Sequence, residues 1–144
     1  MSDTARKEGD HTVETRKPAA IGPYSPVFDD GAYLFCSGQL PIDPQSGELD
    51  GPDIRTQTGR VLSNLEAALR ASGSELSDVV KTTVYLKSLD DFEGMNAVYG
   101  ERLASVMPAR STIGGVALPR GARIEIEAIA RRASGPSGGG SSAG

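Results

Sequence analysis

The sequence predicts one α+β domain: a mixed β-sheet with two helices packed on one of its faces. Segments with strand alternation and segments with helical spacing follow one another in the order strands, helix, strand, helix, strands. A chain of 144 residues is long enough for one hydrophobic core and too short for two, and no repeat of about 20 to 50 residues is visible. We therefore expect one domain over residues 10–133.

Both ends of the chain lack the composition of a packed domain. Residues 1–9 are polar and aperiodic, and residues 134–144 form a Ser/Gly/Pro run with too little apolar surface to offset the entropy lost on ordering. We expect both segments to be disordered.

An Asp-Gly turn marks the first hairpin. Asp29-Asp30-Gly31 has the hairpin signature, and the apolar run Ala32 to Leu40 after it is predicted to be a strand. The preceding loop, residues 18–26, contains three prolines around Tyr24. Tyr24 is predicted either to plug the core or to line a site, since an aromatic ring with a hydroxyl suits both roles.

A long amphipathic helix is predicted over residues 54–71. Asp53 is a candidate N-cap, and Gly73 is a stop signal just beyond the last turn. Apolar side chains recur at helical spacing and predict a core-packing face made of Val61, Leu62, Leu65, Ala68 and Leu69. The polar side chains of this helix are expected to face water, namely Arg60, Asn64, Glu66 and Arg70.

Residues 79–86 alternate as a strand inside the sheet, and a second helix is predicted to follow, ending near Leu103. Asp90-x-x-Glu93 resembles a capping box for that helix. Asn96 lies at the edge of its apolar stripe, where a partly exposed amide is the ordinary outcome. The buried side is predicted to hold Phe92, Met95, Val98, Tyr99 and Leu103.

Arg110 has the most distinctive setting of any arginine in the chain. Pro108 fixes its own φ and biases Met107 toward an extended conformation, so the chain is expected to leave the helix and enter a strand. A guanidinium at a strand entrance presents a planar fork of donors to a carboxylate. A surface ion pair is nevertheless the commoner role of a lone arginine.

The last strand is predicted over residues 123–131. One face holds Ile124, Ile126, Ala128 and Ala130, and the other holds Arg123, Glu125, Glu127 and Ile129. Two helices cover only one face of the sheet, and the opposite face is also predicted to carry large apolar side chains, namely Tyr33, Phe35, Val79 and Tyr85. We expect another copy of the chain, related by closed cyclic symmetry, to cover that face.

Composition excludes several classes of function. The net charge of −4 and the pI near 5.0 argue against a nucleic-acid partner. No apolar run approaches the roughly 20 residues that span a bilayer, and the N-terminus lacks an apolar signal region, so we expect a cytoplasmic protein without a membrane partner. Cys36, the single cysteine, cannot form an internal disulfide and is predicted to serve in packing.

The supply of histidine and cysteine limits the chemistry further. His11 is the only histidine and lies in a polar N-terminal stretch, so neither a Ser-His-Asp triad nor a zinc site of several His or Cys ligands is expected. No glycine-rich phosphate loop is present. Catalysis would have to rest on Arg, Glu, Asp, Tyr, Ser, Asn and backbone groups.

Six motifs, in order along residues 12–132, resemble those of the RidA/YjgF family of enamine/imine deaminases. They are Ala20-Ile21-Gly22-Pro23-Tyr24-Ser25-Pro26, Ser37-Gly38-Gln39-Leu40-Pro41, Val80-Lys81-Thr82-Thr83-Val84-Tyr85, Asp91-Phe92 with Asn96-Ala97-Val98-Tyr99, Pro108-Ala109-Arg110-Ser111, and Ile124-Glu125-Ile126-Glu127-Ala128-Ile129-Ala130. The resemblance implies a chorismate-mutase-like fold and a homotrimer with clefts between subunits. It also implies hydrolysis of 2-aminoacrylate and related imines to 2-keto acids and ammonia, with no metal or organic cofactor.

The resemblance also implies roles for particular residues. Arg110 would hold the substrate carboxylate, and Glu125 would position the attacking water or shuttle a proton. The cleft would be lined by Tyr24, Ser37, Gly38 and Asn96. Many deaminating members have a cysteine where this chain has Thr112, a position that the family uses largely through its main chain.

Two other functions remain open from the sequence. One is a trimer without catalytic activity that binds small acids or protein partners in the same clefts. The other is a chorismate mutase, for which a second cation near the cleft would be favourable, and Arg123 is the candidate because it alternates onto the face of Glu125.

Overall fold

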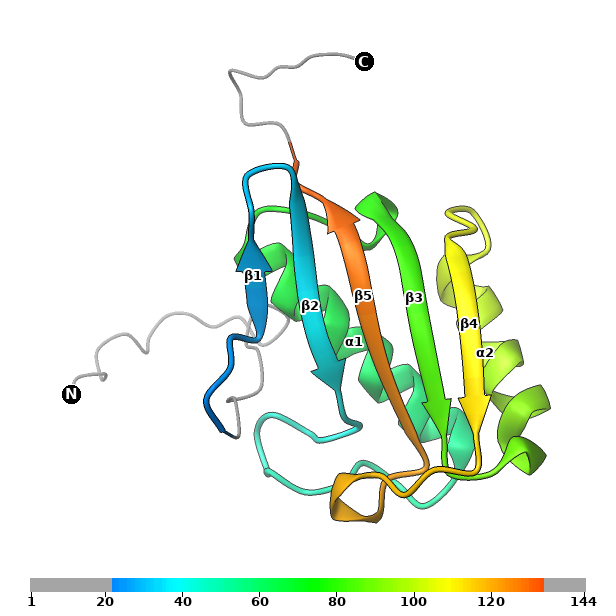
Figure 1. The fold of residues 1–144 in the computed structure, drawn as a ribbon. Helices are drawn as coiled ribbons and strands as arrows, with labels where there is room; N and C mark the ends of the chain where they lie inside the picture. The colour runs from blue at the N-terminus through cyan, green and yellow to red at the C-terminus, as the bar shows by residue number, and fades with distance from the viewer. Residues whose placement is uncertain (1–21, 134–144) are drawn as a thin grey trace.

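The structure is a computed structural model, and it describes residues 22–133 (Figure 1). One five-stranded sheet has the strand order β1-β2-β5-β3-β4. Its neighbouring strands are antiparallel except β3 and β4, which are parallel, so the sheet is mixed as predicted. In chain order the strands and α-helices are β1 (Val27–Asp29), β2 (Tyr33–Gln39), α1 (Ile54–Ala71), β3 (Val79–Leu86), α2 (Phe92–Leu103), β4 (Ala109–Gly114) and β5 (Ile124–Arg131).

Both helices cover the same face of the sheet. In Figure 1 they lie behind it, α1 beneath β2 and β5 and α2 beneath β3 and β4, and the viewer looks onto the other face. Side chains that point toward the helices are fully buried in every central strand, for example Leu34 in β2, Val84 in β3 and Ile126 in β5. The predicted two-layer α+β arrangement is therefore confirmed. We call the uncovered side of the sheet the open face.

The first helix begins and ends where its cap signals predict. The Asp53 carboxylate accepts a hydrogen bond from the backbone N–H of Thr56 at 3.0 Å. Beyond the end of the helix, Gly73 has a φ of +87°, a conformation that favours glycine. The hairpin turn is also as predicted, with the Asp30 carboxylate accepting from the N–H groups of Ala32 and Tyr33.

Asn64 is not on the water-facing side of α1, as the polar pattern predicted. Its side chain is 1% exposed, and its amide donates to the carbonyl oxygens of Leu40 and Ile42, both at 2.9 Å. These bonds satisfy carbonyl groups of the loop that covers the end of the core. Asn64 is therefore a buried link between α1 and that loop.

The start of α2 differs from the predicted capping box. A 3₁₀ turn, Leu89–Asp91, precedes the helix, and the Ser88 hydroxyl caps it by accepting from the N–H of Asp90 at 3.1 Å. The carboxylate of Asp91 pairs with Arg123 at 2.9 Å. The predicted helix end at Leu103 is confirmed.

Met107 has a left-handed backbone, with a φ of +52°, and not the extended conformation that the following Pro108 favours. The N–H of Met107 donates to the Leu103 carbonyl at 2.9 Å. The left-handed residue therefore closes the end of α2, a geometry that outweighs the local preference. The chain then enters β4 at Ala109, so the predicted place of Arg110 near a strand entrance is confirmed.

Val79 belongs to the core and not to the open face. It pairs with Ala130, and both side chains point toward the helices, since the register between β3 and β5 shifts between Val79 and Lys81. Tyr33, Phe35 and Tyr85 do lie on the open face, the first two with 41% of their surface exposed. The predicted Cys36 packing is confirmed, because its side chain is buried on the helix side of β2.

Two earlier expectations lie outside the described residues, namely disorder in residues 1–9 and in residues 134–144. Among residues 22–133, no helix has both the length and the apolar character that crossing a membrane requires.

Candidate active site

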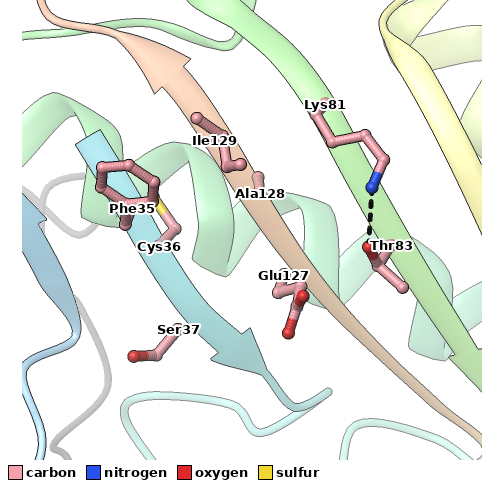
Figure 2. A pocket seen from close by; sticks show the side chains of 8 residues that line it. All are labelled: Phe35, Cys36, Ser37, Lys81, Thr83, Glu127, Ala128 and Ile129. Atoms are coloured by element: carbon pink, nitrogen blue, oxygen red, sulfur yellow. Dashed lines mark hydrogen bonds between the residues drawn. The ribbon is translucent and has the colours of Figure 1, made fainter. Parts of the chain in front are cut away.

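The open face is hollowed where β2, β5 and β3 lie side by side. Figure 2 shows the side chains around this hollow, which has a volume of about 250 Å³. Apolar and polar side chains both line it, and the ammonium of Lys81 donates to the Thr83 hydroxyl at 3.3 Å. The lining residues are Phe35, Cys36, Ser37, Lys81, Thr83, Glu127, Ala128 and Ile129.

Glu125 lies on the same open face, opposite Tyr85 of β3. Its carboxylate packs directly over Gly38, where any side chain would collide with it. The pairing of β2 with β5 is irregular between Cys36 and Gln39, so Gly38 sits in a bulge beside the carboxylate. The structure therefore brings together two of the predicted site residues, Gly38 and Glu125.

The environment of Glu125 favours its protonated form. Partial burial raises the pKa of the Glu125 carboxyl above its usual value, and the nearby charge of Glu127 raises it further. The pKa of the Tyr85 phenol is also raised, by burial and by the charges of Glu127 and Glu125. A carboxyl with a raised pKa can accept and return a proton closer to neutral pH.

Ser37 joins the loop that carries Tyr24 to the end of β2. Its hydroxyl donates to the Ser25 carbonyl at 2.7 Å, and its N–H donates to the Pro26 carbonyl at 2.9 Å. Tyr24 is 48% exposed, so it does not plug the core of this chain. Ser37 thus links the loop of Tyr24 to Gly38, the residue over which the Glu125 carboxylate packs. We call Tyr24, Ser37, Gly38 and Glu125 the Glu125 group.

Arg110 lies on the other side of the sheet. It pairs with Thr82 in the parallel ladder between β3 and β4, and its side chain runs along α2. The guanidinium carbon is 4.8 Å from the ring centre of Tyr99 and 5.6 Å from that of Phe92. One guanidinium nitrogen is 4.0 Å from the sulfur of Met95.

Arg110 differs from the other partly buried arginines of residues 22–133 in its lack of an acidic partner. Arg60 pairs with Asp50 at 3.0 Å, and Arg102 pairs with Glu66 at 2.9 Å. Within the described residues, no carboxylate lies within ion-pair distance of Arg110, and its one hydrogen-bond contact is the weak one with Met95. A half-buried cation with unused donors is suited to an anion that comes from outside the chain.

Two further predicted residues lie on the Arg110 side. Thr112 pairs with Val84 and shares the side of β4 with Arg110, and it is half-buried. Asn96 follows Met95 on α2 and is also half-buried. We call Arg110, Thr112 and Asn96 the Arg110 group.

The sheet therefore separates the two groups within one chain. β4 is an edge strand, and the hydrogen-bonded ladders of β3 and β5 lie between Arg110 and Glu125. Arg123 joins neither group, which corrects its predicted place beside Glu125. Its guanidinium donates to the Asp91 carboxylate and to the Pro52 carbonyl, which hold it at the end of the sheet.

The aromatic surroundings of Arg110 were not recognised as part of a site from the sequence. Tyr99 and Met95 were predicted only as core residues, and both are buried. Phe92 was predicted to be buried but is 38% exposed. Its spacing of seven residues from Tyr99 places both rings on one face of α2. That spacing predicts an aromatic face on the helix but does not show that Arg110 lies against it.

Known proteins support the resemblance carried by the motifs. Residues 14–132 match the family described as endoribonuclease L-PSP. A RutC family protein of Pyrococcus horikoshii is 50% identical over 113 residues, which cover 78% of this chain and 90% of the relative. A Mus musculus protein named 2-iminobutanoate/2-iminopropanoate deaminase is 42% identical over 116 residues, which cover 81% of this chain and 86% of the relative.

Solved structures give the same result. The crystal structure of E. coli TdcF with bound serine superimposes with a TM-score of 0.78 at 38% identity, covering 83% of this chain and 95% of that one. At this identity the likeness extends to the family as well as the fold, and the predicted chorismate-mutase-like architecture is confirmed. The chain therefore belongs to the RidA/YjgF family, the family described as endoribonuclease L-PSP.

Proposed function

We propose that this protein hydrolyses reactive enamine and imine intermediates, 2-aminoacrylate and related 2-imino acids, to 2-keto acids and ammonia. The observation that carries the proposal is the half-buried Arg110 guanidinium, which has no carboxylate partner among residues 22–133. A 2-imino acid supplies the missing carboxylate. The mouse relative named as a deaminase of two such imines adds support at 42% identity.

The chemistry requires little beyond orientation and proton transfer. Arg110 holds the substrate carboxylate in the plane of its donor fork. Glu125 accepts a proton from a water molecule while the water oxygen attacks the imine carbon. It gives that proton to the imine nitrogen, which forms a carbinolamine. It then takes the carbinolamine hydroxyl proton and passes it to the nitrogen as the carbon–nitrogen bond breaks, leaving a keto acid and ammonia. The raised pKa of Glu125 makes its carboxylate a stronger base for taking the proton from water.

A second copy of the chain would bring the two groups together. Arg110 and Glu125 belong to opposite faces of one sheet, so one chain alone does not aim both at the same substrate. We propose a homotrimer in which the open face is covered and each cleft joins the Arg110 group of one subunit to the Glu125 group of the next. The exposed Tyr33 and Phe35 support an interface there.

The remaining predicted residues line the cleft in this proposal. Gly38 leaves room for the Glu125 carboxylate, and Ser37 holds the loop of Tyr24 in place. Asn96 and Thr112 flank the anchor. Thr112 replaces the family's frequent cysteine and would act through its backbone.

We propose that the substrate is a small molecule and that the reaction needs no cofactor. We also propose that the protein acts in the cytoplasm and does not bind nucleic acid. The net charge of −4 and the pair Glu125 and Glu127 on the open face disfavour a polyanion, although the family description names an endoribonuclease. The free, buried Cys36 suits a reducing compartment.

A competition assay tests the function. An amino-acid oxidase generates the imine, semicarbazide traps it, and an active deaminase slows formation of the semicarbazone. We expect activity in the wild type, almost none in Arg110→Ala, and wild-type activity in Arg70→Ala, which removes a surface arginine from α1. A wild type that binds 2-oxobutanoate but leaves trapping unchanged would instead be the non-catalytic acid-binding trimer.

A further inference from the structure

The Arg110 guanidinium rests against one face of α2. It lies over the ring of Tyr99 at 4.8 Å and beside the ring of Phe92 at 5.6 Å. Both distances are within the range of cation–π attraction, which is stronger where water is excluded. Tyr99 is buried and Phe92 is 38% exposed, so Tyr99 provides the drier and closer contact.

Tyr99 is itself held by the sheet. Its hydroxyl is 2.7 Å from the Thr82 hydroxyl, and both groups are buried. Thr82 is also the residue directly across the ladder from Arg110. One residue of β3 is therefore both the backbone partner of the arginine and the hydrogen-bond partner of the ring against which its guanidinium lies.

This arrangement suits an arginine that binds a carboxylate through two hydrogen bonds at once. Contact with an aromatic ring uses the face of a guanidinium and leaves the N–H groups at its edges available to a carboxylate. The Tyr99 hydroxyl is engaged with Thr82, so it does not consume those donors. The contact with Met95 is long and weak and consumes little of them.

We propose that Tyr99, locked by Thr82, is a positioning residue that fixes the plane of the Arg110 guanidinium for bidentate capture of a 2-imino acid carboxylate. This inference rests on the anchoring role proposed for Arg110. Tyr99 acts through Arg110 and does not touch the substrate. Its loss affects capture of the carboxylate and leaves the proton transfers at Glu125 intact.

The test compares variants that remove the ring, the hydroxyl or the lock. Tyr99→Leu removes the ring and is expected to raise KM for 2-iminobutanoate about tenfold, with kcat within about twofold of wild type. Tyr99→Phe and Thr82→Val each break the hydrogen bond and are expected to raise KM about threefold. The double variant Tyr99→Phe/Thr82→Val should be no worse than either alone, because both remove the same bond.

Two controls separate positioning from general loss of structure. Leu103→Val perturbs a buried residue one turn further along α2 and is expected to lower the melting temperature without changing KM. In an Arg110→Lys background, which has no planar fork, Tyr99→Leu is expected to change KM by less than about twofold. Calorimetric binding of 2-oxobutanoate should weaken in parallel with KM.

The outcomes distinguish this inference from the proposed function. If Arg110→Ala retained wild-type turnover, the proposed function of the site would fail. If Arg110→Ala were inactive while the Tyr99 variants kept a wild-type KM, only the positioning role would be overturned. A Tyr99→Leu that did not fold would leave the decision to Tyr99→Phe and Thr82→Val, and a wild-type KM in both would refute the lock.

Discussion

The two faces of the sheet are built from the same strands but carry different kinds of side chain. Leu34, Val84 and Ile126 face the helices and are fully buried, whereas Phe35, Thr83 and Glu127 alternate with them on the open face. The first face forms the core that every folded copy of the chain needs. The second carries exposed aromatic side chains next to carboxylates. A soluble monomer has no need of such a surface, which is typical of an interface or a binding site.

Arg110 is an exception to this division, because it lies on the helix side of the sheet without being part of the core. It is on the helix side, yet it lies on the edge strand β4, where the core ends and α2 supplies aromatic faces in place of aliphatic packing. A side chain can therefore share a face with the core and still be available for binding. The proposed site combines Arg110, at the edge of the helix-covered face, with Glu125, on the open face.

The largest expected effect comes from placing a charge on the open face. Phe35→Glu should prevent trimer formation, since a buried carboxylate without a partner is unfavourable, and should abolish deaminase activity. Light scattering is expected to give about three times the chain mass of 15.0 kDa for the wild type and a single chain mass for the variant. Ala71→Glu, an exposed change on α1, serves as the control and should remain trimeric. A monomeric, active wild type would contradict the proposed cleft.

Glu125→Gln should lower kcat about a hundredfold, because an amide of similar size can neither accept nor return the proton. Binding of 2-oxobutanoate should persist, since the carboxylate anchor is unchanged. Steady-state kinetics and calorimetry measure the two effects separately. Wild-type kcat in this variant would mean that Glu125 is only a charge on the open face.

Arg110→Lys should lower kcat/KM by about thirtyfold, or roughly 2 kcal/mol, while the protein remains folded and trimeric. Lysine keeps the charge but presents a compact ammonium that cannot fix the plane of a carboxylate. Kinetics with 2-aminoacrylate provide the measurement. A value within about twofold of wild type would show that charge alone anchors the substrate.

The smallest expected effect is a dependence of stability on pH. Because the folded pKa of Glu125 is raised, the folded protein binds this proton more tightly than the unfolded chain does. Stability from this group is present below the unfolded pKa and is lost as pH rises through the folded pKa. Glu125→Gln should therefore melt slightly above wild type at pH 7 and converge with it near pH 4. If wild type melted at a higher temperature than Glu125→Gln at pH 7, the charged Glu125 would not lower the stability of the fold.

Much of the fold followed from local patterns, and the failures have identifiable causes. The ends of α1 were predictable because Asp53 and Gly73 act within their own turns. Asn64, Val79 and Met107 were misplaced because loop carbonyls, a register shift and the closure of α2 decided their positions. None of these features is visible in residue type or spacing.

The candidate site was predictable in its residues but not in its arrangement. The motifs indicated Arg110 and Glu125, and Gly38 does lie against Glu125. The side of the sheet that Arg110 occupies depends on the parallel register between β3 and β4, which no short-range pattern specifies. The contact of Tyr99 with Arg110 follows from that register and was missed for the same reason.

The path of the chain through β3, α2 and β4 has a consequence for how the two halves of the site form. Thr82, Tyr99 and Arg110 all lie within residues 79–114, a single strand–helix–strand crossover. By contrast, Gly38 and Glu125 meet only when the two ends of the described chain pair as β2 and β5. Contacts of short sequence separation close with less loss of chain entropy, so we expect the arginine half to assemble earlier in folding than the glutamate half.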